Sequence, residues 1–176
     1  MNRLLRFGAV LPLLAILGAS VAPAQVSFNV AAGLAVPTGD LSDFSDAGYA
    51  LIAGLGTKPI ASPLAFRVEG IFTQFNVKNS SDANTRIIGG TGNAIYDFSM
   101  GPGIIFTPYA TGGVGFYSTR FENRLGGSGS DTNFGWNIGG GIRTGLSGFS
   151  AYVEARYHSV GNNGGSFIPI VFGLSF

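Results

Sequence analysis

Polar and apolar side chains alternate along the segment 150–159, SAYVEARYHS, with a period of two residues. One parity holds Tyr152, Glu154, Arg156 and His158, and the other holds mostly alanine, valine and tyrosine. Successive side chains of a β-strand point to opposite faces, so this pattern predicts a strand with one polar face and one apolar face. The segment alone does not decide which face points inward.

Residues 1–24, MNRLLRFGAVLPLLAILGASVAPA, have the pattern of a secretory signal peptide. A basic start precedes an apolar run, and the small residues Ala22 and Ala24 occupy the positions that signal peptidase recognises before its cleavage site. We expect cleavage before Gln25. A transmembrane anchor is the alternative, but the apolar run is shorter than about 20 residues and Pro12 interrupts it.

The composition restricts the fold class further. The chain has 176 residues with no cysteine, so no disulfide framework holds it together. Its net charge of +1 becomes −1 without Arg3 and Arg6 of the leader, which argues against nucleic acid as a partner. Only 11% of residues are charged, mean hydropathy is +0.34, and no apolar helix after residue 25 is long enough to span a bilayer. A chain this apolar that lacks a membrane-spanning helix can cross a bilayer only as a closed barrel, in which the backbone N–H and C=O groups of neighbouring strands pair with one another.

Strand-like segments recur along residues 25–176, which we expect to form one domain. They are 26–36, 48–57, 64–76, 87–98, 106–121, 133–146, 149–159 and 167–176. The connections alternate between long polar segments (37–47, 77–86, 122–132, 160–166) and short ones (58–63, 99–105, 147–148). Long outer loops and short periplasmic turns are typical of outer-membrane barrels. The sequence therefore predicts an all-β fold, an eight-stranded antiparallel up-and-down transmembrane β-barrel.

The distribution of charge over the two parities decides which face is inside. In the strands 64–76 and 133–146 the apolar parity carries no charge, whereas a soluble lipid-binding barrel would place apolar residues inside and charges outside. Aromatic residues near strand ends suit an interfacial girdle; they are Tyr96, Phe98, Phe106, Phe116, Phe121, Phe134, Trp136, Phe149 and Tyr157. We therefore expect lipid outside, and a soluble periplasmic barrel remains the alternative.

The charged residues expected inside the barrel are Arg67, Glu69, Asp97, Arg143, Glu154 and Arg156. Side chains fill the interior of an eight-stranded barrel, and an unpaired charge there is costly. Three acids and three bases can neutralise one another, so we predict a packed polar interior with an ion-pair network. We expect the glycines at 113, 115, 139, 141 and 145 to make room for the arginines. An ion-pair gate that passes small solutes is the alternative.

The signal peptide, the eight amphipathic strands, the segment YVEARYH and the terminal IVFGLSF together resemble the small outer-membrane barrels related to the OmpA transmembrane domain and OmpX. The resemblance covers residues 26–176. It implies that the barrel assembly machinery reads the last strand, here through Phe172, Leu174 and Phe176. Gly173 stands nearer the end than the usual glycine, and Pro169 suggests a bulge or a rim position.

Candidate catalytic and metal-binding residues are few. His158 and Ser159 suggest a hydrolase, because some small outer-membrane barrels are lipid A deacylases. Adjacent strand residues point to opposite faces, however, so His158 is better read as a rim histidine beside a loop. Asp40, Asp43 and Asp46 form either a weak calcium site or, by preference, a set of solvated loop acids. We expect no catalytic residues, metal or cofactor.

The predicted role follows from the fold. We expect a monomeric, non-enzymatic barrel of the bacterial outer membrane, serving envelope structure or surface interaction. Its partners would be outer-membrane lipids, lipopolysaccharide contacted by Arg120 and Arg124, and the barrel assembly machinery. The alternatives are a narrow channel or small-solute transporter, a lipid A-modifying enzyme and a soluble periplasmic lipid-binding barrel.

Overall fold

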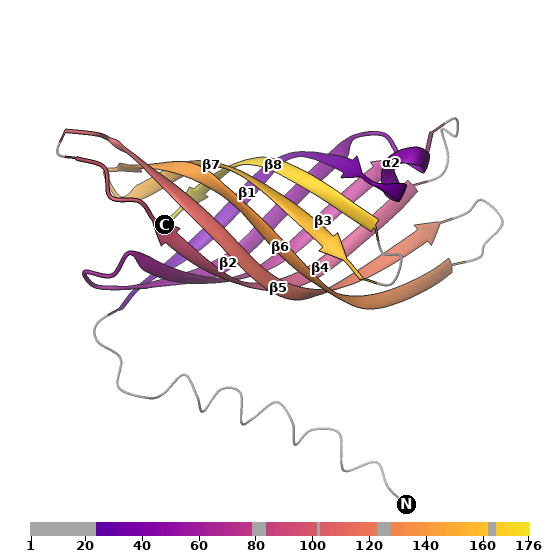
Figure 1. Cartoon of the computed structure of the whole chain (residues 1–176), viewed down its shortest axis with the longest axis horizontal. Helices are drawn as coiled ribbons and strands as arrows, with labels where there is room; N and C mark the ends of the chain where they lie inside the picture. Colours follow the sequence, from indigo (N-terminus) through magenta and orange to yellow (C-terminus); the bar gives the residue numbers. More distant parts are fainter. Residues whose placement is uncertain (1–23, 79–83, 102, 123–127, 162–164) are drawn as a thin grey trace, which may run out of the picture.

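The fold is a closed antiparallel barrel in which each strand pairs with its sequence neighbours and the last strand pairs with the first (Figure 1). The computed structural model describes residues 24–78, 84–101, 103–122, 128–161 and 165–176. The elements are β1 (Ala24–Thr38), α2 (Asp40–Phe44), β2 (Gly48–Pro59), β3 (Leu64–Asn76), β4 (Asn84–Asp97), β5 (Phe106–Glu122), β6 (Ser128–Leu146), β7 (Phe149–Val160) and β8 (Gly165–Ser175). The predicted fold class is thus confirmed. Residues 1–23 lie outside the described part, so the signal peptide stays a prediction.

Two features were not read from the sequence. The fifth and sixth strands extend further than predicted, because pairing continues from Arg120 with Ser130 to Glu122 with Ser128. The residues that begin β6, SGSDT, show no apolar alternation, so no periodicity marked them as strand. The first outer loop contains the five-residue helix α2. Within the described part of the chain, no helix is long and apolar enough to cross a bilayer.

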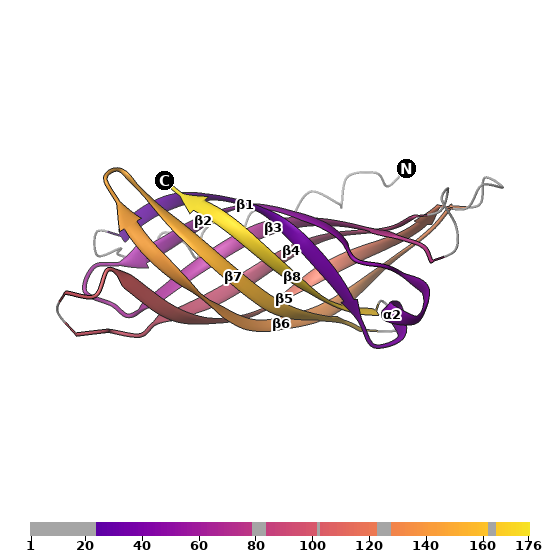
Figure 2. The same ribbon diagram turned by 90° about the horizontal axis from the view of Figure 1, so that it is seen from above.

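The strand register gives the barrel its stagger. A path that follows paired residues around the barrel from Ser27 on β1 passes Gly56 and Arg67 and returns to β1 at Pro37, ten residues further along. A staggered barrel has tilted strands, and Figure 2 shows them running obliquely to the long axis. With eight strands, the interior is only wide enough for side chains.

The two faces of the strands are placed as predicted. The inward residues Arg67 and Glu69 are 5% and 3% exposed, whereas the outward Val68 between them is 69% exposed. Outward aromatic residues form pairs near both ends of the barrel. Near the outer loops, ring centroids of Phe116 and Phe134 are 5.6 Å apart, and near the chain termini those of Phe149 and Phe176 are 6.1 Å apart.

Pro169 corrects one expectation. Its side chain is buried inside the barrel, and it lies neither in a bulge nor at the rim. The strands β7 and β8 keep the same register on both sides of it, with Ala155 opposite Ile170 and His158 opposite Phe167. The ladder is interrupted only locally, because proline has no backbone N–H to donate.

Large inward side chains pack over glycines of the neighbouring strand. A Cβ atom on Gly139 would lie 2.1 Å from the carbonyl oxygen of Ala155 and 2.6 Å from the Cα of Arg156. A Cβ atom on Gly173 would lie 2.2 Å from the Cζ atom of Tyr152. Glycine is therefore required where a long side chain crosses a narrow lumen.

Only one of the five glycines expected to accommodate arginines faces one. Gly139 adjoins Arg156, whereas the others adjoin Asn93 (Gly113), Thr91 (Gly115), Tyr109 (Gly141) or open space (Gly145). Of these glycines, Gly141 accommodates an inward tyrosine, and Gly113 and Gly115 adjoin smaller polar side chains of β4.

Gly139 and Gly145 share the inward face of β6 and provide a matched pair of variants. Gly139→Ala should lower the free energy of unfolding by about 1–3 kcal/mol, because the added methyl group overlaps backbone atoms of β7. Gly145→Ala should change it by less than about 0.5 kcal/mol, because no atom lies within 4 Å of the added Cβ. Urea unfolding in detergent, followed by the gel mobility of unheated samples, measures both. Equal midpoints for the two variants would contradict this account of the packing.

Candidate functional site: the barrel interior

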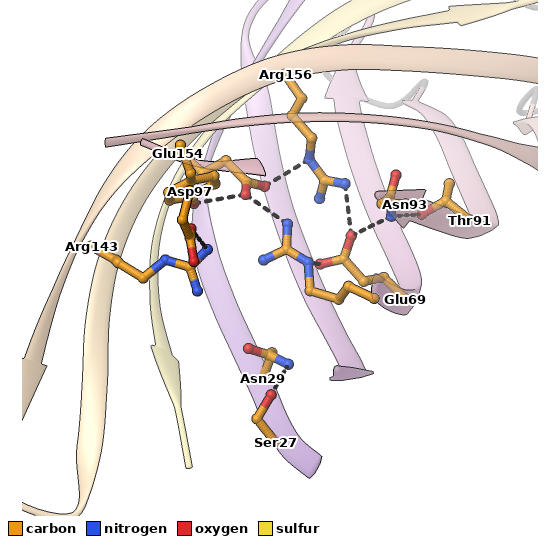
Figure 3. A network of polar contacts seen from close by, with 11 residues as sticks. Ser27, Asn29, Glu69, Thr91, Asn93, Asp97, Arg143, Glu154 and Arg156 are labelled. Carbon is orange, nitrogen blue, oxygen red and sulfur yellow. Dashed lines mark hydrogen bonds and ion pairs between the residues drawn. The ribbon is translucent and has the colours of Figure 1, made fainter. Parts of the chain in front are cut away.

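Four charged side chains form a closed ring of ion pairs across the lumen (Figure 3). Arg67 contacts Glu154 at 2.6 Å and Glu69 at 2.9 Å. Arg156 contacts both glutamates at 2.7 Å. Two arginines and two glutamates balance in charge, and each carboxylate lies between two guanidinium groups. The Arg67 Nε contact with Glu69 is an ion pair without hydrogen-bond alignment.

The strand geometry explains why these four residues meet. Arg67 and Glu69 are two residues apart on β3, and Glu154 and Arg156 are two apart on β7, so each pair shares the inward face. The strands β3 and β7 are four strands apart in either direction around the barrel. The ring therefore joins opposite walls and crosses the full width of the lumen.

Neutral polar groups complete the ring. The hydroxyl of Tyr109 donates a hydrogen bond to Glu154 at 2.8 Å, and the Asn93 amide donates to Glu69 at 2.9 Å. Arg67, Glu69, Glu154 and Arg156 are all at most 5% exposed. Buried charges remain ionised only when paired and hydrogen-bonded, and the arrangement satisfies both conditions.

A second cluster lies nearer the end of the barrel at which β1 begins and β8 ends, which we call the terminal end. Asp97 accepts hydrogen bonds from Arg143 Nη2 and Lys58 Nζ, each at 2.5 Å. The guanidinium of Arg143 also lies 4.6 Å from the centre of the Tyr109 ring. The structure thus places all six charged residues of the sequence analysis inside the barrel, but in two groups.

Lys58 was missed because the sequence analysis ended the second strand at residue 57 and assigned residue 58 to a turn. The strand β2 continues to Pro59, and Lys58 has the same inward parity as the buried Ala50 and Ile52. Continuing the inward alternation of β2 from residue 56 to residue 58 would have identified Lys58 as an interior charge.

Aromatic and apolar side chains fill the outer half of the interior. His158 is 0% exposed, its ring is stacked on Phe167 with centroids 4.9 Å apart, and its Nδ1 lies 2.8 Å from the hydroxyl of Tyr117. Phe75 packs on Phe167 at 5.9 Å. His158 is therefore not the rim histidine that we expected, because its inward parity places it inside this aromatic cluster.

The structure separates the two residues that suggested a hydrolase, and it shows no grouping of metal ligands among the described residues. Ser159 has the opposite parity to His158 on β7, so the two side chains lie on different faces of the barrel wall. Asp40 and Asp43 belong to the first turn of α2 and are exposed, as is Asp46. Within the described ranges, no three histidine, cysteine or acidic side chains are grouped so that they could hold a metal ion.

The interior is open at one end. A cavity of about 870 Å³ occupies the mouth at the terminal end and is lined by Lys58, Asp97 and Arg143 together with apolar residues. A smaller cavity of about 70 Å³ continues inward as far as Arg67. Access from this end therefore stops at the ion-pair ring.

Comparison with known proteins agrees with this geometry. The model of the outer membrane protein beta-barrel domain matches residues 9–176. The chain belongs to this family. It is therefore a protein of the bacterial outer membrane, with the apolar face toward lipid, and the soluble alternative is wrong. No curated protein matches the sequence.

Several solved structures share the fold of this outer membrane protein beta-barrel domain. Neisserial surface protein A is 15% identical with a TM-score of 0.68, over 87% of this chain and 97% of that chain. The N-terminal barrel domain of Pseudomonas aeruginosa OprF is 16% identical with a TM-score of 0.53, over 88% and 98%. The attachment invasion locus protein Ail of Yersinia pestis, solved with the heparin analogue sucrose octasulfate, is 16% identical with a TM-score of 0.51, over 87% and 97%.

The pairing that closes this beta-barrel domain continues one residue beyond β8, to Phe176. The backbone N–H and C=O groups of Phe176 pair with those of Phe28, each at 2.9 Å. Phe172 and Phe176 are both 57% exposed on the outward face, and Leu174 shares their parity. Recognition of these three residues by the assembly machinery stays a prediction.

Replacing Glu154 tests the importance of the ring. Glu154→Gln removes the negative charge that two arginines share, so it should lower the free energy of unfolding by about 3–5 kcal/mol. The urea midpoint in detergent measures the loss.

A charge-balanced double variant provides the control. Glu154→Gln with Arg67→Met restores neutrality and should recover part of the lost stability, because an apolar side chain replaces the unpaired cation. An unchanged midpoint for Glu154→Gln would show that the ring does not stabilise the barrel.

Proposed function

We propose that the protein is a non-conducting, non-catalytic barrel that contributes to envelope structure and presents its outer end for contacts at the cell surface. The ion-pair ring carries this proposal. It joins β3 to β7 across a lumen that is only wide enough for side chains, and its members are almost completely buried. An ion would have to break several paired charges to pass.

The short helix α2 is held in a fixed place at the outer end of the barrel. Leu41 of α2 is buried, and the Cβ position of Gly165 at the start of β8 lies 3.2 Å from its side chain. Lys78 anchors the other end of the helix, donating from Nζ to the carbonyl of Ser42 at 2.6 Å and from its backbone N–H to that of Phe44 at 2.9 Å. The helix is thereby held at the outer rim, between the start of β8 and the residues that follow β3.

A role in surface contact is supported by the outer end itself. Phe44 of α2 is 68% exposed, next to the exposed carboxylates Asp40 and Asp43. These side chains are accessible to other molecules at the cell surface. Among the barrels of the same fold, Ail of Yersinia pestis is named as an attachment invasion locus protein.

A narrow channel is the second candidate function. The cavities at the terminal end reach inward to Arg67. A solute that enters from the periplasm would therefore be blocked first at the ion-pair ring. Passage would require rearrangement of both the ion pairs and the aromatic side chains around His158.

Conductance in planar lipid bilayers separates the two functions. We expect no discrete steps from the wild-type protein, because the ring and the aromatic cluster block the lumen in series. A porin added to the same bilayer serves as the positive control. A gel shift between heated and unheated samples verifies that the protein is folded.

Steps of reproducible amplitude would overturn the proposal if Arg143→Gln altered their amplitude or ion selectivity. Arg143 lines the terminal mouth, so flow through the lumen would respond to the loss of its charge, whereas leakage around the protein would not.

A further inference from the structure

Two adjoining cavities occupy the lumen between the ion-pair ring and the terminal end. The smaller one, of about 70 Å³, reaches Arg67, and we call it the inner cavity. The larger one, of about 870 Å³, opens at the terminal end, and we call it the mouth cavity. Five residues line both cavities: Ser27, Lys58, Arg143, Ser150 and Ser175. A molecule held in the mouth cavity can therefore extend a small group into the inner cavity.

The wall of the inner cavity carries positive charge. Lys58, Arg67 and Arg143 all line it, and none of the described residues that line it is acidic. The glutamates of the ring supply the counter-charge of Arg67. Lys58 and Arg143 share the single carboxylate of Asp97, which lines the mouth cavity and whose contact with Arg143 is drawn in Figure 3. These two cations therefore have one counter-charge between them.

The charges of the ring and of the second cluster do not balance. Together they comprise four basic side chains (Lys58, Arg67, Arg143 and Arg156) and three acidic ones (Glu69, Asp97 and Glu154), so one positive charge remains. One monoanion would restore neutrality, whereas a doubly charged phosphate would leave one negative charge in excess. Because an uncompensated buried charge is costly, the balance favours a ligand with a single negative charge.

The inner cavity also has hydrogen-bond donors that are not in use. Tyr152 is only 6% exposed and lines this cavity, and its hydroxyl has no hydrogen-bond partner among the described residues. On the neighbouring strand, Arg143 lies directly opposite Tyr152, and its buried Nε atom is equally without a partner there. Unpaired buried polar groups cost free energy, so most have a partner. A carboxylate beside Tyr152 and Arg143 would accept hydrogen bonds from both.

The sizes of the two cavities divide a ligand into two parts. A water molecule needs roughly 10–15 Å³ of such space, so the inner cavity accommodates a carboxylate group and little more. The mouth cavity accommodates the rest of the molecule, between serine hydroxyls and the aromatic side chains of Phe98, Phe106 and Phe149. A lining of apolar side chains with a few polar groups suits an organic molecule better than an inorganic ion.

We propose that the two cavities form a binding site for a small organic monocarboxylate that enters from the periplasm. Its carboxylate occupies the inner cavity beside Lys58, Arg143 and Tyr152, and its body lies in the mouth cavity. A guanidinium has five N–H donors, so Arg143 can bind Asp97 through Nη2 and a second carboxylate through its remaining N–H groups. Binding requires no passage through the ring, so the proposal holds whether or not the lumen conducts.

This site lies at the opposite end of the barrel from the lipopolysaccharide contact expected from the sequence. Arg120 lies on β5 near the outer loops, and Arg124 lies outside the described residues. The lipopolysaccharide contact stays a prediction.

Matched pairs of an acid and its carboxamide test the proposal on the wild-type barrel. N-acetyl-alanyl-alanine and gluconate provide a peptide body and a polyol body, and each is compared with its own primary amide. Isothermal titration calorimetry of the folded protein in an uncharged detergent measures the dissociation constants. At least one acid should bind ten or more times as tightly as its amide, and the tighter acid identifies the source as a peptide or a sugar acid. Equal affinity of acid and amide in both pairs would overturn the proposal.

Variants then assign the carboxylate to the inner cavity. Arg143→Gln and Lys58→Gln should each weaken binding of the acid at least tenfold. Tyr152→Phe keeps every charge and should weaken binding at least threefold, because one hydrogen bond to a charged group is lost. Lys78→Gln is the matched control, since it removes an exposed positive charge at the outer end and should leave the affinity unchanged. The heat-dependent gel shift verifies folding, and wild-type affinity in either Arg143→Gln or Tyr152→Phe would overturn the assignment.

Acetate separates an organic carboxylate site from a simple anion site. It carries the same charged group without a body to fill the mouth cavity, so it should bind at least ten times more weakly than the preferred acid. If acetate bound as tightly, the mouth cavity would add nothing to recognition, and the proposal would fail.

Discussion

The structure depends on the pairing of backbone hydrogen-bonding groups in a medium that contains no water to replace them. A bilayer offers no partner for an exposed N–H or C=O group, so the sheet must close on itself. Pairing of β1 with β8 provides that closure, and it extends to the last residue through Phe28 and Phe176. Pro169, which has no N–H, interrupts the ladder without shifting its register, and its side chain turns into the lumen.

Closure with eight strands determines the interior. The lumen is narrow, so long inward side chains reach the opposite wall, and charges placed there must find partners. The two arginines and two glutamates of the ring do so across the full width of the barrel. Glycines opposite the long arginine and tyrosine side chains make this packing sterically feasible. Stability and obstruction of the lumen are thus consequences of the same contacts.

The two ends of the barrel differ in chemistry. At the outer end aromatic side chains around His158 and Phe167 fill the interior, and at the terminal end a cavity of about 870 Å³ exposes Arg143 and Lys58 to the solvent. The outward face also changes along the barrel, from the apolar band to polar side chains near the outer loops, among them Gln74, Arg86 and Arg120. The proposed contacts at the cell surface would therefore form at the outer end.

Period-two alternation in the sequence determined the eight strands, their faces and the charges that point inward, because alternation is a local property of each strand. It did not reveal which charges pair. Arg67 and Glu154 are 87 residues apart, and their contact depends on the stagger of ten residues around the closed sheet. Residues near strand ends, such as Lys58 and Arg86, were assigned to connections because the sequence pattern alone does not mark where cross-strand pairing stops. His158 was likewise placed at the rim, since only the closed barrel shows how far the interior reaches beyond the ion pairs. The sequence therefore determined which face each side chain occupies, and the tertiary structure decided its neighbours, because neighbours are set by the register between strands that are distant in the chain.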